Sequence, residues 1–266
     1  MSRLNENPLL RRIAMPVLQK LGDRRITIRH HWTGAPLTLN VFRHRGYWYF
    51  GKARERSTIE RARALVPAGG TVVELGGHIG YLAMIFADAV GQGGRVIVFE
   101  PGSVNLDYTR ANLGPLSQVT LEELAVADFE GRTTFYSEDL SGQNSSLVGD
   151  YSVGQNVAEN AHVQVNRTEE TVTVTTLDAY CSAHGIAPDF IKIDIEGAEL
   201  SALKGAERTL AEHRPALMVE VTEHVSEVLS FLDGLGYRLE TPEGETVHPD
   251  TDELIFNVFA LPKEAG

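Results

Sequence analysis

TVVELGGHIGYLA, residues 71–83, runs from an apolar segment through a glycine-rich turn into a second apolar segment. The first five residues are typical of a buried strand, and YLAMIFADAV (81–90) is typical of a helix. In open α/β sheets, the turn of such a unit lies at the carboxyl edge of the sheet, where ligands bind. The stretch therefore predicts an α/β fold with a ligand site beside Gly76, Gly77 and Gly80.

The alternation of strand and helix continues along most of the chain. Apolar runs predict strands at 95–100, 119–126, 189–194 and 216–221, and helical periodicity predicts helices at 105–113, 198–213 and 224–236. Short antiparallel strands are expected at 132–137, 162–165 and 171–177, around a polar loop at 137–160. Alternating strands and helices imply right-handed crossovers and a mainly parallel sheet. The final strands, 237–241 and 253–261, have no helix between them and predict an antiparallel edge.

The N-terminal part differs in composition from the rest, which predicts a basic extension at 1–56 and a main domain at 57–266. Residues 1–22 are expected to form a short amphipathic helix interrupted at a proline. Residues 25–42 alternate on either side of a turn, which predicts a β-hairpin. HRGYWYFGK (44–52) is interpreted as an aromatic-rich surface strand, with a lid, a dimer contact and core packing as its alternative roles.

The composition limits the class of protein. With 266 residues, 42% of them hydrophobic, the chain can bury one substantial core. Its single cysteine, Cys181, excludes an intrachain disulfide and a cysteine-based zinc cluster, and it fits a reducing, cytoplasmic setting. No apolar run approaches the roughly 20 residues of a membrane span. We therefore expect a cytoplasmic protein without a membrane span.

The net charge of −12 is unevenly distributed. Residues 1–56 carry 12 Lys and Arg against 3 Asp and Glu, a net +9, whereas residues 57–266 carry 12 against 33, a net −21. The acidic main domain makes nucleic acid an unexpected partner. The basic extension could contact an anionic substrate, a membrane surface, or the acidic body of its own subunit or of a neighbouring one. We favour packing on the acidic body of its own subunit, and a homo-oligomer stays open.

Two acidic residues accompany the glycine turn. Glu74 precedes the glycines, where a carboxylate suits a cationic ligand group better than a pyrophosphate. Glu100 follows the next strand, in a position to accept hydrogen bonds from a ribose diol. The spacing is G-G-x-x-G and not the G-x-G-x-x-G of dinucleotide-binding sites. S-adenosylmethionine fits this combination, and NAD fits it poorly.

DFIKIDIEGAEL (189–200) places charged residues at the end of a core strand. Lys192 and Asp194 share one face of that strand, and an unpaired charge there would be very costly to bury. The two can compensate each other or pair with Glu220. Glu199 is interpreted as stabilising the start of the next helix. For Asp194 we favour a functional role, whereas Lys192 and Glu196 could be either structural or functional.

These segments resemble the FkbM type of S-adenosylmethionine-dependent methyltransferase. The resemblance rests on VVELGGHIGY, VFEPGSVNLDYTRANL and, above all, DFIKIDIEGAELSALKGAERTL, and it runs from about residue 45 to 261. It implies a class I methyltransferase fold, a Rossmann-like seven-stranded α/β sandwich. The expected cofactor-binding residues are Glu74, Gly76, Gly77, His78, Gly80, Tyr81, Glu100, Pro101, Ala125, Asp128 and Asp194. Many family members have Asp in place of Glu74 and Asn in place of His78, and both changes keep a polar group.

The resemblance also implies the acceptor, a hydroxyl of a sugar or of another small natural product. An alcohol is a weak nucleophile until its proton is removed or a metal lowers its pKa. Asp194 could act alone as a base or could bind Mg²⁺ together with Glu220. The catalytic candidates are Asp194, Lys192, Glu196 and Glu220. The polar loop adds acceptor-binding candidates, Gln143, Asn144, Ser145 and Ser146.

Two other functions remain open from the sequence. One is a dehydrogenase on a related nucleotide-binding fold, against which the glycine spacing argues. The other is a non-catalytic binding or scaffold protein that keeps the cofactor pocket. The presence of Glu100, Lys192 and Asp194 argues against that alternative.

Overall fold

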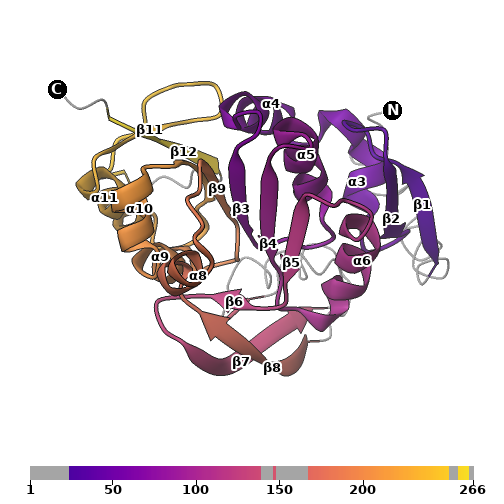
Figure 1. The fold of residues 1–266 in the computed structure, drawn as a ribbon. Helices are drawn as coiled ribbons and strands as arrows, with labels where there is room; N and C mark the ends of the chain where they lie inside the picture. The colour runs from indigo at the N-terminus through magenta and orange to yellow at the C-terminus, as the bar shows by residue number, and fades with distance from the viewer. Residues whose placement is uncertain (1–23, 139–145, 148–166, 252–256, 264–266) are drawn as a thin grey trace, which may run out of the picture.

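Residues 24–138, 146–147, 167–251 and 257–263 are described by the computed structural model. Seven strands form one sheet in the order β11-β12-β10-β9-β3-β4-β5 (Figure 1). Their bounds are β3 Thr71–Leu75, β4 Arg95–Phe99, β5 Val119–Glu122, β9 Phe190–Ile193, β10 Ala216–Glu220, β11 Tyr237–Glu240 and β12 Asn257–Pro262. The pairs among β5, β4, β3, β9 and β10 are parallel, and β12 runs antiparallel to both neighbours. The predicted fold class, with its antiparallel edge, is confirmed.

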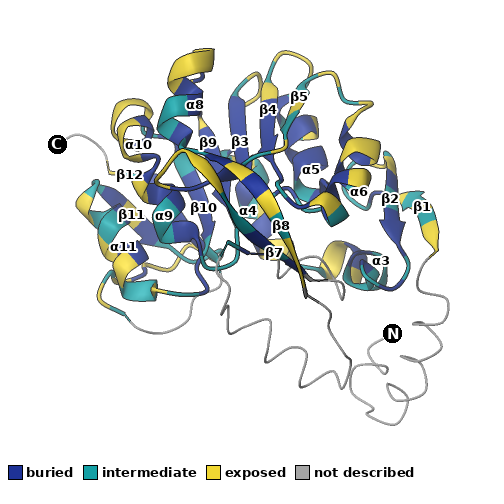
Figure 2. Cartoon of the chain, turned by 90° about the horizontal axis from the view of Figure 1, so that it is seen from below, coloured by how far each residue is buried: buried dark blue, intermediate teal, exposed yellow. Residues whose placement is uncertain are grey.

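Both faces of this sheet are covered, so its central strands are buried along their whole length (Figure 2). One face packs against α4 (Arg56–Leu65), α5 (Tyr81–Val90) and α6 (Ser103–Leu113). The other face packs against α8 (Leu177–His184), α9 (Glu199–Lys204), α10 (Glu207–His213) and α11 (Val225–Gly234). In β9, Ile191 and Ile193 belong to the second core and Phe190 to the first. The expected division of this strand between two faces is confirmed.

A second, three-stranded sheet lies across one end of the large sheet (Figure 1). It contains β6 (Ala125–Val126), β7 (Gly131–Glu138) and β8 (Arg167–Thr175), in the order β6-β8-β7. The prediction of one strand at 119–126 is wrong, because the chain leaves the large sheet after β5 and enters the small one as β6. β7 and β8 are antiparallel, as expected, whereas β6 is parallel to β8. The strand predicted at 162–165 lies outside the described residues.

The N-terminal part contains the predicted hairpin, formed by β1 (Arg25–Arg29) and β2 (Pro36–Asn40). The strand predicted at 44–52 is wrong, because the chain forms helix α3 (Arg45–Phe50) and a short 3₁₀ turn, Gly51–Ala53. The side chain of Asn40 accepts hydrogen bonds from two backbone N–H groups beyond it, which turns the chain out of the hairpin before α3 begins. The helix predicted at 1–22 lies outside the described residues.

Two helical details also differ from expectation. The helix predicted at 198–213 is divided into α9 and α10 at Gly205 and Ala206, and Gly205 sits against the backbone of Ala127, where a side chain has no space. Helix α8 was not predicted, although Thr176 caps its first turn and Gly185 ends it in the left-handed conformation. Within the described residues, no helix is both long and apolar enough to cross a membrane.

Candidate active site

A cavity of about 350 Å³ opens at the carboxyl ends of β3, β4, β9 and β10. The small sheet borders it through Ala125 and Phe135, and α3 borders it from the N-terminal side through Tyr47. The predicted site residues that line the cavity are Glu74, Gly76, Gly77, His78, Tyr81, Glu100, Pro101, Ala125, Lys192, Asp194, Glu196 and Glu220. The structure thus brings together most of the residues that the sequence singled out.

The glycine turn is packed too tightly for side chains. Gly76 has a φ of 85°, and a Cβ there would lie 1.8 Å from the backbone oxygen of Asp194. A Cβ on Gly77 would lie 2.4 Å from Cγ1 of Val98. The N–H groups of both glycines donate to the carbonyl oxygen of Phe99, at 3.0 Å each. The turn is therefore held between β4 and β9, and its backbone forms part of the cavity wall.

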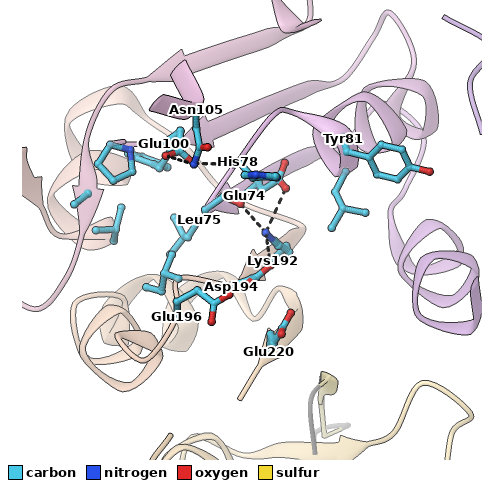
Figure 3. A pocket seen from close by; sticks show the side chains of 18 of the residues that line it. Glu74, Leu75, His78, Tyr81, Glu100, Asn105, Lys192, Asp194, Glu196 and Glu220 are labelled. Carbon is cyan, nitrogen blue, oxygen red and sulfur yellow. Dashed lines mark hydrogen bonds and ion pairs between the residues drawn. The ribbon is translucent and has the colours of Figure 1, made fainter. Parts of the chain in front are cut away.

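Lys192 is the central cation of the site, with 3% of its side chain exposed. Its Nζ donates to the carbonyl oxygen of Gly76 at 2.7 Å and lies 3.2 Å from Asp194 Oδ2 and 3.5 Å from Glu74 Oε1 (Figure 3). Burial lowers the pKa of Lys192, but attraction to Asp194 and Glu74 outweighs burial and raises the pKa above its usual range. An ammonium group with three acceptors is a charge compensator and not a base.

Glu74 is 1% exposed, and its Oε2 makes no hydrogen bond within the described residues, so one oxygen is left unsatisfied there. Burial raises the pKa of Glu74 to about 7, although Lys192 opposes the shift. A buried carboxylate oxygen without a donor is costly, unless a ligand supplies the donor. Because Glu74 lines the cavity, a cationic ligand group in the cavity would meet that need.

Glu100 is buried at the end of β4, and its carboxylate is hydrogen-bonded to the glycine turn after β3. It accepts hydrogen bonds from the N–H of His78 at 2.7 Å, the N–H of Gly102 at 2.9 Å and Nδ2 of Asn105 at 3.3 Å. Burial raises the pKa of Glu100 to about 7, against the effect of these donors. A carboxylate has about four acceptor positions, so Glu100 keeps capacity for a further donor from the cavity.

A cluster of carboxylates lines the opposite wall of the cavity (Figure 3). The side chain of Asp194 is 29% exposed, and Glu196 holds a left-handed φ of 55°. Burial, together with repulsion from Asp194 and Glu196, raises the pKa of Glu220 to about 10. The shift favours the protonated form of Glu220, which makes this residue a poorer proton acceptor than an ionised carboxylate. In the described part of the chain, no group of three or more His, Cys, Asp or Glu could hold a metal ion.

The remaining predicted residues lie beside the cavity or outside the described residues. Gly80 precedes α5 with a φ of 81°, and Asp128 accepts a hydrogen bond from Ser201, which ties the small sheet to α9. Ser146 is buried, and its hydroxyl donates to the carbonyl oxygen of Glu196. Gln143, Asn144 and Ser145 lie outside the described residues. The carboxylate of Glu199 accepts from the N–H of Gly197 at 2.9 Å, a structural role in the turn before α9.

Sequence reasoning missed cavity residues in the N-terminal part of the chain and on α6. Arg54 and Glu55, which pair at 3.0 Å, and Tyr47 line the cavity from the N-terminal part. Only the aromatic character of 44–52 pointed there, and it predicted a strand. Asn105 was read only as part of a helix, although its place five residues after Glu100 puts it in the first turn of α6, facing that carboxylate.

Comparisons with known proteins agree with this geometry. The family model described as the methyltransferase FkbM domain matches residues 74–239. The 2-O-methyltransferase NoeI of Sinorhizobium fredii (strain NBRC 101917 / NGR234) is 30% identical over 123 residues, which are 45% of this chain and 51% of NoeI. The match thus spans about half the length of that curated relative.

Solved structures show similarity at a lower level. Methyltransferase FkbM from Methylobacillus flagellatus KT is 21% identical with a TM-score of 0.47, over 72% of this chain and 43% of that chain. A SAM-dependent O-methyltransferase from Thermotoga maritima is 16% identical with a TM-score of 0.41, over 78% of this chain and 64% of that chain.

The family match confirms the resemblance that the sequence indicated. It covers more than half of the chain, and it includes the glycine turn, Glu100 and the strand that carries Lys192 and Asp194. The chain belongs to the FkbM family of methyltransferases.

Proposed function

We propose that this protein is an S-adenosylmethionine-dependent O-methyltransferase whose acceptor is a hydroxyl of a sugar or of another small natural product. One observation carries the proposal. The cavity joins an unsatisfied buried carboxylate oxygen on Glu74 to a partly exposed carboxylate on Asp194, with Lys192 between them. The oxygen of Glu74 suits a cationic group of the cofactor, and the carboxylate of Asp194 suits the proton of the acceptor hydroxyl.

The residues present fit S-adenosylmethionine. Oε2 of Glu74 has no donor among the residues that the structure describes, and the ammonium of a methionine moiety would supply one. Glu100 would accept from the ribose hydroxyls, and the close packing of Gly76 and Gly77 allows backbone to approach the ligand. Ala125 and Pro101 would border the adenine on the side of the small sheet. When bound, the cofactor supplies a methyl group on a sulfonium, which is already a good leaving group.

Asp194 is the residue best placed to act on the acceptor. It follows the last residue of β9 at the cavity wall, and its ion pair with Lys192 fixes the orientation of its carboxylate. We assign to Asp194 the role of orienting the acceptor hydroxyl and accepting its proton as the new bond forms. Glu220 is the weaker candidate, because burial and the neighbouring carboxylates raise its pKa and favour its protonated form.

The acceptor class draws support from the name of one relative. NoeI is described as a 2-O-methyltransferase, so at least one similar protein acts on oxygen. A neutral, hydroxylated acceptor also fits a cavity wall that contains Glu55, Asp194 and Glu196, because carboxylate oxygens accept hydrogen bonds from hydroxyl groups.

The experiment has two stages. S-adenosylmethionine with a labelled methyl group is incubated with the protein and an extract of the native host, and mass spectrometry identifies the labelled product. The kcat of Asp194→Asn on that acceptor should then be lower by about 10²- to 10⁴-fold, with cofactor affinity changed only a few-fold. Asp88→Asn, an exposed aspartate on α5, is the matched control.

Each stage can contradict the proposal. If no acceptor is labelled and no S-adenosylhomocysteine forms, the protein is a cofactor-binding or scaffold protein. If the product carries its label on nitrogen or carbon, the acceptor class is wrong. If the Asp194→Asn variant keeps full activity, Asp194 is only the counter-ion of Lys192.

A further inference from the structure

Helix α3 lies before the segment that the family model matches, and yet it reaches the cofactor side of the cavity. Its residue Tyr47 is buried and lines the cavity next to His78 and Tyr81. This position raises the question of what an N-terminal tyrosine contributes to a turn that binds the cofactor.

Tyr47 is held on several sides. Its hydroxyl lies 3.0 Å from Nδ1 of His78, and its ring stacks on the imidazole with centroids 5.8 Å apart at an interplanar angle of 26°. The ring of Tyr81 lies 4.7 Å away, and the guanidinium of Arg54 lies 4.8 Å from the centre of the Tyr47 ring. The phenol therefore has little freedom to move away from His78.

The position of His78 affects the rest of the site, because its backbone is strained and is hydrogen-bonded to Glu100. It adopts a φ of 49°, which costs a non-glycine residue on the order of 1 kcal/mol or more. Its N–H donates to Glu100 Oε2 at 2.7 Å, and its carbonyl oxygen accepts from the hydroxyl of Thr109. A shift of His78 would therefore move the carboxylate that faces the ribose position.

The protonation states of Tyr47 and His44 agree with a hydrogen bond between uncharged Tyr47 and His78 side chains. Burial raises the pKa of Tyr47 above its usual range, so the phenol keeps its proton and can donate to His78 Nδ1. His44 packs edge-on against His78, with ring centroids 5.2 Å apart. Burial and the proximity of His78 lower the pKa of His44 to about 2, and its Nδ1 accepts from the N–H of Asn40. His44 is therefore a neutral imidazole and places no positive charge beside His78.

We propose that Tyr47 is a positioning residue for the cofactor: its hydroxyl fixes the imidazole of His78, and the fixed backbone of His78 holds Glu100 in place for the ribose. The N-terminal part of the chain is thereby a component of the cofactor site. The inference rests on the proposed function, since S-adenosylmethionine is the ligand that reports the effect.

The test is the Tyr47→Phe variant, which keeps the ring and its stacking and removes only the hydroxyl. Calorimetry should show S-adenosylmethionine binding that is about 3- to 10-fold weaker, as expected for one hydrogen bond. The Tm of the free protein should fall by no more than about 2–4 °C, the effect of losing one buried hydrogen bond. Tyr49→Phe is the matched control, because it makes the same change on the same helix without lining the cavity, and its affinity should stay within about 2-fold.

A double-mutant cycle separates this role from general packing. In a His78→Asn background, where asparagine tolerates the left-handed φ, Tyr47→Phe should change the affinity by less than about 2-fold. Equal losses in both backgrounds, or no loss in either, would overturn the inference and leave the proposed function intact. If the wild type fails to bind S-adenosylmethionine, both proposals fail. The ¹⁵N shifts of the His78 ring should also change in Tyr47→Phe, independently of any ligand.

Discussion

The contacts of Lys192 explain why charged residues stand at the end of a buried strand. A lysine in a buried strand is costly by itself, but here it satisfies three acceptors from two strands and the glycine turn. It also keeps two carboxylates of the cavity wall, Glu74 and Asp194, next to one compensating charge. The sequence predicted the pairing with Asp194, whereas the contact with Glu74 depends on the parallel register that places Glu74 beside Lys192.

Removing this charge should destabilise the protein. Lys192→Met keeps the apolar stem and leaves Glu74 and Asp194 without a counter-charge, so we expect a loss of about 3–5 kcal/mol in unfolding free energy. Urea denaturation measures it, with Lys204→Met on the exposed side of α9 as the control. Adding Glu74→Gln to Lys192→Met should recover part of the loss. A Lys192→Met variant as stable as the wild type would show that the ammonium is not needed for charge balance.

Among the elements, β3 and the turn after it were the easiest to predict. An apolar run, two adjacent glycines and an apolar helical segment are local signals, and the structure follows them closely. Helix α3 could not be predicted in this way, because its aromatic residues favour a strand by propensity. Its conformation depends on the packing of Tyr47 against His78 and Tyr81, which are more than 30 residues away.

The candidate site, like the fold, could be predicted in part from the sequence. Residues at the ends of predicted parallel strands, such as Glu74, Glu100 and Asp194, had to meet at one edge of the sheet. Tyr47 on α3 and Glu55 just before α4 come from a part of the chain whose place in the fold no local pattern specifies. Asp128, expected among the cofactor-binding residues, does not line the cavity, and its carboxylate accepts from Ser201 on α9, a contact that depends on how the small sheet is placed.

The glycine turn allows a direct test of close packing. Gly76→Ala combines a left-handed φ with a Cβ at 1.8 Å from the backbone of Asp194, so the turn or β9 must move. Gly69→Ala has a similar φ, 75°, with open space around it, and it should cost only about 1–2 kcal/mol. We expect Gly76→Ala to cost several kcal/mol more in thermal or urea unfolding. Equal costs for the two variants would contradict the packing that we describe.

In the whole molecule, the cavity is assembled from segments that lie far apart in sequence. Tyr47 and Glu55 come from the N-terminal part, Glu74 and Glu100 from the first strands of the sheet, and Glu220 from β10. The two cores, one on each face of the sheet, meet in the strands that end at the cavity. A ligand that contacts all these segments is therefore coupled to unfolding of the whole domain and not of one element.

This coupling predicts a large thermal shift. At a concentration of about 100 times its Kd, S-adenosylmethionine should stabilise the protein by about 2.7 kcal/mol, which raises the Tm by about 5–10 °C. NAD at the same concentration should shift the Tm far less, because the glycine turn lacks the spacing that receives a pyrophosphate. Glu100→Ala is the matched variant, since it removes the expected ribose acceptor and should reduce the shift. Differential scanning fluorimetry measures all three cases, and an equal or larger shift with NAD would favour a dehydrogenase over a methyltransferase.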